Sequence, residues 1–110
     1  MLKSSLTALA RHHLEIAQST TSGRSASTVY GGHEHVLRQT MIALAMGRTL
    51  SEHDNPGEAT IQVLHGRVRL RAGGEGWDGA IGDFLIVPNS RHDLEALENA
   101  VILLTVAKRR

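Results

Sequence analysis

The stretch VLHGRVRLRAGGEGWDGAIGDFLIVP, residues 63–88, decides the fold class. Its RVRLRA segment alternates arginines with Val68 and Leu70, which is the period of a strand with one wet and one buried face. Gly66 separates this strand from an apolar strand before it, and the glycine-rich residues 73–82 indicate a hairpin region that leads to the apolar run FLIVP. Short strands joined by tight turns favour a small antiparallel β-barrel or sandwich over an alternating α/β fold.

One helix is predicted before the strands, which occupy most of the chain. Leu2, Leu6, Leu9 and His13 recur at helical spacing before a polar run at residues 18–27, so we predict one amino-terminal helix, capped by Ser4 or Ser5. Residues 1–24 are then the helix and its loop, and residues 25–110 form the barrel. The apolar run at residues 101–107 predicts a central strand buried on both faces. We place the strands near residues 26–30, 36–46, 48–52, 59–65, 67–72, 83–87, 91–97 and 100–107.

Composition excludes several classes of function. A chain of 110 residues matches one domain, and its formal charge of +1 and three aromatic residues argue against nucleic acid as a partner. No apolar run is long enough to cross a membrane, and no signal-peptide pattern opens the chain, so we expect a soluble, cytoplasmic protein with no membrane partner. The absence of cysteine means that nitrogen and oxygen atoms would have to hold any metal.

Two segments resemble the motifs of the cupin superfamily of small jelly-roll barrels. Gly47, His53 and Gly66 keep the spacing of the first motif, but Asn55 stands at its second histidine and Ala59 at its glutamate. In the second segment, GDFLIVPNSRH, the residues Gly82, Pro88 and His92 match the second motif; Ser90 replaces its glycine, and the spacing before the histidine is one residue shorter. The frame of both motifs is kept, while the set of metal ligands is reduced.

The resemblance implies an all-β, antiparallel jelly-roll barrel that forms a homodimer and binds a small molecule. It implies His53, Asn55 and His92 as cavity residues. As metal ligands it implies His53 and His92, completed by Asn55 or Glu58, with iron, zinc, nickel or manganese as the divalent ion. Two histidines fall short of the three or four ligands that such ions take, and Glu58 precedes the glutamate position by one residue. Because neighbouring strand residues point to opposite faces, Glu58 reaches the site only if the strand register shifts.

Three functions follow, from different classes. The first is a barrel that binds a small molecule without catalysis, with His53 and His92 as polar anchors. The alternative is a metal-dependent cupin enzyme, a dioxygenase or isomerase, with an atypical third ligand. The third is an interaction module that works through its helix and dimer. We expect three further features to be structural rather than functional. The His33 and His35 pair is predicted to lie in a surface turn, and His13 to pack on the helix with one hydrogen bond. The arginines of residues 67–71 are predicted to form the solvent-exposed face of a strand.

Overall fold

The computed structural model describes residues 3–53 and 57–108, with the backbone alone at residues 52 and 53. Within these residues one helix precedes a series of strands, and the described strand pairs are all antiparallel. The elements are α1 (Leu6–Ser19), β1 (Arg24–Tyr30), β2 (Leu37–Leu44), β3 (Thr49–His53), β4 (Gly57–His65), β5 (Arg67–Ala72), β6 (Glu75–Ala80), β7 (Phe84–Ile86), β8 (His92–Ala96) and β9 (Ala100–Lys108).

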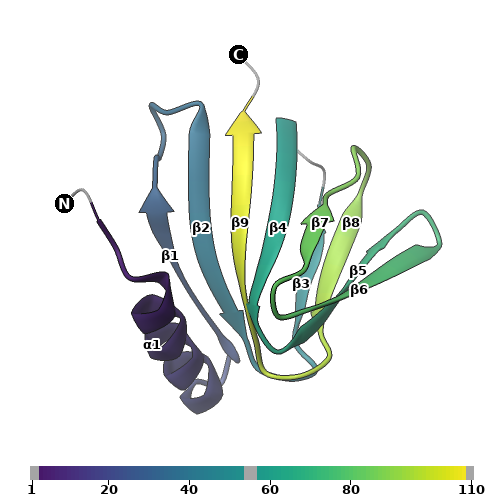
Figure 1. Ribbon diagram of the computed structural model, residues 1–110. Helices are drawn as coiled ribbons and strands as arrows, with labels where there is room; N and C mark the ends of the chain where they lie inside the picture. Colours follow the sequence, from purple (N-terminus) through teal and green to yellow (C-terminus); the bar gives the residue numbers. More distant parts are fainter. Residues whose placement is uncertain (1–2, 54–56, 109–110) are drawn as a thin grey trace.

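The strands form two sheets that face each other. One sheet has the order β1-β2-β9-β4-β7 and the other has the order β3-β8-β5-β6, so that strands distant in sequence are neighbours, as in a jelly roll (Figure 1). The predicted all-β fold with one amino-terminal helix is therefore confirmed. β9 lies at the centre of the five-stranded sheet, as the apolar run at residues 101–107 predicts.

Aliphatic side chains fill the space between the sheets. Val68, Leu70, Leu94 and Ile102 are each at most 2% exposed, and no aromatic residue belongs to this core. Strand alternation places them there, because residues of β5 that face inward are separated by arginines that face solvent. Among the described residues, the buried members of this cluster are Ile42, Leu44, Ala59, Ile61, Val63, Val68, Leu70, Val87, Leu94, Ala96, Ala100, Ile102 and Val106.

Helix α1 covers the outer face of the five-stranded sheet beside β1 and β2 (Figure 1). Ser5 caps its first turn, because the Ser5 hydroxyl oxygen accepts a hydrogen bond from the backbone nitrogen of Ala8 at 3.2 Å. Ala17 of the helix packs with Met41 and Val101 of the sheet in a second apolar cluster. This second cluster explains why β9 is buried on both faces.

His13 fastens the helix to the edge strand β1. Its two ring nitrogens lie 2.7 Å from the hydroxyl oxygens of Ser25 and Ser27, so the ring makes two hydrogen bonds where the sequence predicted one. Burial, with a smaller effect from the neighbouring ring of His12, lowers the pKa of His13. The neutral ring therefore belongs to the helix-docked state.

The structure departs from the prediction at two places. β6 (Glu75–Ala80) is a full strand paired with β5, where the sequence indicated only a glycine-rich hairpin region. The helix begins at Leu6, and Leu2, with which the predicted periodicity starts, lies outside the described residues. No helix in the described part of the chain is both long and apolar enough to cross a membrane.

Candidate ligand-binding site

His92 begins β8 and lies between two neighbouring strands at one end of the four-stranded sheet. Its backbone pairs with that of His53 on β3 and with that of Ala72 on β5. Leu94, two residues further along β8, is a core residue, so His92 shares its inward face. The side chain of His92 is 7% exposed. The two histidines of the sequence motifs are thus cross-strand neighbours.

A hydrogen bond to the Ser90 backbone orients the His92 ring. Its Nδ1 atom lies 2.9 Å from the backbone carbonyl oxygen of Ser90. A carbonyl oxygen only accepts hydrogen bonds, so Nδ1 donates and carries the hydrogen. In the neutral ring, Nε2 is then the atom with the lone pair, the form in which imidazole accepts a hydrogen bond or binds a metal. Ser90 is the residue that replaces the glycine of the second motif, and its carbonyl supplies the orienting contact.

A second row of inward-facing residues lies on the five-stranded sheet. Arg38 of β2 pairs with Val106 of β9, which pairs in turn with Ala59 of β4. The backbone nitrogen of Val87 donates to the carbonyl oxygen of Ala59 at 3.0 Å and extends the row. Val106, Ala59 and Val87 are buried core residues, and Arg38 is half-buried. The sequence analysis missed Arg38, although counting back by twos from the buried Ile42 would have found it.

The two rows lie at the same end of the barrel. β2 and β4 begin, β8 begins and β9 ends near the top of Figure 1, on sheets that face each other across the core. Arg38, Ala59 and Val106 come from one sheet, and Ala72 and His92 come from the other. We call these five residues the His92 end of the barrel. It places two polar side chains next to apolar ones, which is the composition of small-molecule sites.

The structure does not bring Glu58 to this end. β4 pairs with β9 without a shift from Gly57 to Val63, so Glu58 is exposed on the outer face while Ala59 faces the core. The register shift that Glu58 would have needed does not occur, which corrects its assignment as a metal ligand. Asn55 lies outside the described residues. Within the described ranges, no three histidine or acidic side chains are grouped closely enough to hold a metal ion.

The paired histidines earlier in the chain lie elsewhere. His33 and His35 are exposed in the turn between β1 and β2, where they do not form the strand that would align them. The ring of His35 meets that of Tyr30 edge to face, with centroids 5.5 Å apart. The surface-turn interpretation therefore describes this cluster.

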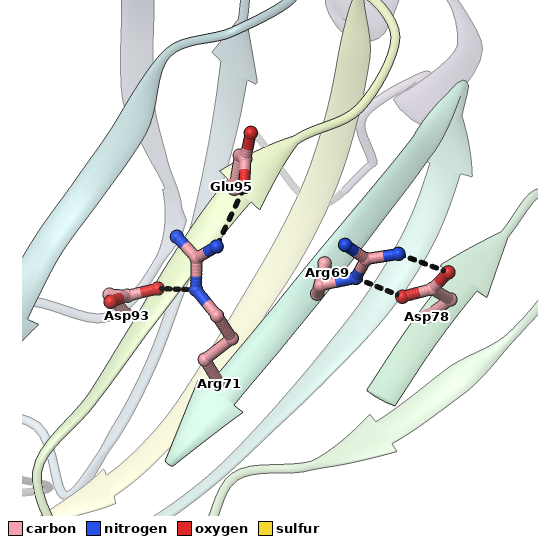
Figure 2. Close-up of polar contacts among 5 residues, drawn as sticks. All are labelled: Arg69, Arg71, Asp78, Asp93 and Glu95. Atoms are coloured by element: carbon pink, nitrogen blue, oxygen red, sulfur yellow. Dashed lines mark hydrogen bonds and ion pairs between the residues drawn. The ribbon is translucent and has the colours of Figure 1, made fainter. Parts of the chain in front are cut away.

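The arginine row of β5 faces solvent and is neutralised by acids. Arg69 binds both carboxylate oxygens of Asp78, at 2.7 and 3.1 Å, and Arg71 lies between Asp93 at 2.9 Å and Glu95 at 2.8 Å (Figure 2). Hydrogen bonding and charge attraction lower the pKa of Asp78 and raise the pKa of Arg69. These arginines have intramolecular partners, which weakens any interpretation of the row as an anion-binding surface.

Comparison with solved structures finds the same fold repeatedly. A conserved protein of unknown function from Streptococcus pyogenes is 25% identical, with a TM-score of 0.74 over 83% of this chain and 79% of that one. A cupin superfamily protein from Desulfitobacterium hafniense is 16% identical, with a TM-score of 0.69 over 77% of this chain and 79% of its own. A cupin 2 conserved barrel domain protein from Leptotrichia buccalis is 24% identical, with a TM-score of 0.73 over 86% of this chain and 45% of that protein.

Comparison by sequence finds no relative, in contrast to comparison by structure. No protein-family model matches the chain, and no curated protein matches it in sequence. The likeness therefore lies in the arrangement of the strands.

Proposed function

Because this chain has the fold of the cupin superfamily, we propose that it is a small cupin-like protein that binds a small organic molecule at the His92 end of its barrel. His92 is the polar anchor of this site, and the motif resemblance adds His53, whose backbone pairs with that of His92, as a second ligand-binding residue. Ala59, Ala72 and Val106 supply the apolar walls. Ligand binding, rather than catalysis, is the activity that these residues support.

One observation carries the proposal. Among the described residues, His13 and His92 are the only buried polar side chains. His13 has a structural role, because both of its ring nitrogens bind hydroxyls that fasten the helix. His92 instead lies on the face of β8 that points into an aliphatic core, and its Nδ1 atom bonds the Ser90 carbonyl. A buried polar side chain among apolar ones at the end of a barrel is typical of a ligand-binding site.

The alternative is a metal-dependent cupin enzyme, and the backbone pairing of His53 with His92 is the observation that favours it. Two histidines would supply two of the four ligands that a divalent metal ion commonly takes. The remaining donor set does not fit, since Ala59 has no donor atom at the glutamate position and Glu58 lies on the outer face. Binding without a resident metal therefore agrees better with the described residues.

The homodimer that the resemblance implies is also part of the proposal. The short edge strand β7 exposes Phe84 and Ile86, which are 61% and 75% accessible, and unpaired edges with apolar side chains favour association. Measuring the molar mass in solution tests this part directly.

Replacing His92 by leucine tests the ligand site, because a binding residue and a structural residue respond in opposite ways. We expect His92→Leu to keep or raise the melting temperature, since leucine extends the apolar contacts of the neighbouring core residues. The same variant should lose the binding of any compound found by screening organic acids, amides, alcohols and sugars against the imidazole resonances of the wild-type protein. His33→Gln, in an exposed turn, is the matched control and should keep that binding. A strong loss of stability in His92→Leu, with no compound or metal ion shifting the His92 resonances, would contradict the proposal.

A further inference from the structure

Arg38 differs from the arginines that surround the four-stranded sheet. Arg67, Arg69 and Arg71 each have an acidic partner within 4 Å on the outer face. Arg38 is half-buried on the inward face of β2, and within the part of the chain that the structure describes its side chain forms no ion pair and no hydrogen bond. It is thus a cation at the barrel interior that the described residues do not neutralise.

The cross-strand neighbours of Arg38 are apolar and buried. Its cross-strand partner Val106 is 4% exposed, and Ala59, the next residue in the row, is 8% exposed. A guanidinium beside apolar groups has lost part of its hydration, and a nearby anion would replace what was lost. The planar group also presents two parallel N–H donors, which match the two oxygens of a carboxylate.

We propose that the molecule bound at the His92 end is a small organic carboxylate and that Arg38 selects it by its charge. The carboxylate lies on the guanidinium of Arg38, and the apolar body of the ligand lies over Val106, Ala59 and Ala72 toward His92. This inference rests on the proposed ligand site. It adds the chemical class of the ligand and a specificity residue that the sequence motifs do not contain.

A purely structural role for Arg38 makes a different prediction. Its methylene stem would pack on Val106 while the charged group reached solvent, as long cationic side chains do at the rim of an apolar surface. In that case methionine would replace arginine without any effect on ligand choice. Ligand selectivity, measured beside stability, therefore separates the two roles.

The test compares carboxylates with amides of the same shape, hexanoate with hexanamide and benzoate with benzamide. Binding is followed through the His92 imidazole and Arg38 Nε–H resonances during titration. In the wild-type protein each carboxylate should bind about 10- to 100-fold more tightly than its amide, the effect of one charge-assisted pair. Arg38→Met should abolish this preference while leaving amide binding unchanged, and Arg38→Lys, which keeps the charge but loses the fork, should retain part of it.

Arg24→Met is the matched control. It removes the same charge from the same sheet, but Arg24 is exposed and pairs with Leu44, at the opposite end of β2 from Arg38. It should keep the full carboxylate preference. Arg38→Met should melt no lower than the wild-type protein, because an unpaired charge has been removed.

The outcomes separate this inference from the function on which it rests. Equal affinity for carboxylate and amide, or a preference that survives in Arg38→Met, overturns the anion inference and leaves the ligand site standing. Binding of some other compound class at His92, with no carboxylate bound, does the same. If no compound of any class shifts the His92 resonances, the proposed function fails and the inference fails with it.

Discussion

Ala59 of β4 lies directly across from Val106 of β9, and both side chains are buried in the core between the sheets. Ala59 occupies the position at which the first cupin motif has its glutamate. The methyl group therefore stands where the motif would place a carboxylate, on the inward face and in the register that the motif needs. At the position of the motif's glutamate, this chain thus has a methyl group in an apolar contact with its cross-strand neighbour.

Restoring the acid should restore a response to metal ions. We expect Ala59→Glu to lower the melting temperature in the presence of a chelator, since an unpaired buried carboxylate costs several kcal/mol or takes up a proton. Zinc, nickel or manganese should raise it again by binding to the folded state. Thermal unfolding with chelator and with each ion measures both effects.

Ala59→Gln is the control, because it adds nearly the same volume without the charge. It should be destabilised without a strong response to metal. A wild-type protein that is itself stabilised by these ions would contradict the conclusion that the described ligands are too few.

Gly66 is the residue on which the β4–β5 connection depends. Its φ angle is +73°, and a Cβ atom placed there would collide with the carbonyl of Asn99. Gly74, in the β5–β6 turn, has a φ angle of +82° with open space around it. Gly74→Ala should therefore lose about 1–2 kcal/mol of unfolding free energy, the strain of the left-handed conformation. Gly66→Ala should lose about 2–5 kcal/mol, since overpacking adds to that strain. Urea unfolding of the two variants makes the comparison, and equal losses would count against the collision.

Local patterns in the sequence were sufficient to predict much of the fold. The alternating arginines of residues 67–71 correspond to β5, and the break at Gly66 corresponds to the end of β4. Both could be predicted because one face of each strand is buried, so that apolar residues recur at every second position of the sequence. The uninterrupted apolar run at residues 101–107 predicts a central strand for a similar reason, since β9 has the core on one face and the helix on the other.

The rest depends on contacts between distant segments. The residues EGWDGA form β6 although two glycines weaken their strand propensity, because six consecutive cross-strand pairs with β5 hold them. The site shows the same limit. The motifs predicted His92 as a site residue. The position of Arg38 in one row with Val106 and Ala59 depends on the register of three strands, which a single sequence does not specify.

The contacts of His13 predict how stability depends on pH. Its folded-state pKa is lowered, chiefly by burial, so the folded state binds a proton less readily than the unfolded chain does. The contribution of His13 is fully present above the unfolded pKa of about 6.5 and is lost as the pH falls through the lower folded-state value. At neutral pH, His13→Gln should lose about 1–3 kcal/mol, because the hydroxyls of Ser25 and Ser27 lose their partners.

Urea unfolding between about pH 5 and about pH 8 measures the titration of His13 apart from that of the other histidines. The unfolding free energy of the wild-type protein should fall toward the acid end more steeply than that of His13→Gln, which has no proton to take up at this position. His33→Gln, in its exposed turn, should follow the wild-type curve. Parallel curves for the wild-type protein and His13→Gln would show that the ring is not held neutral between the two serines, and that packing of Ala17 on Met41 and Val101 fastens the helix without it.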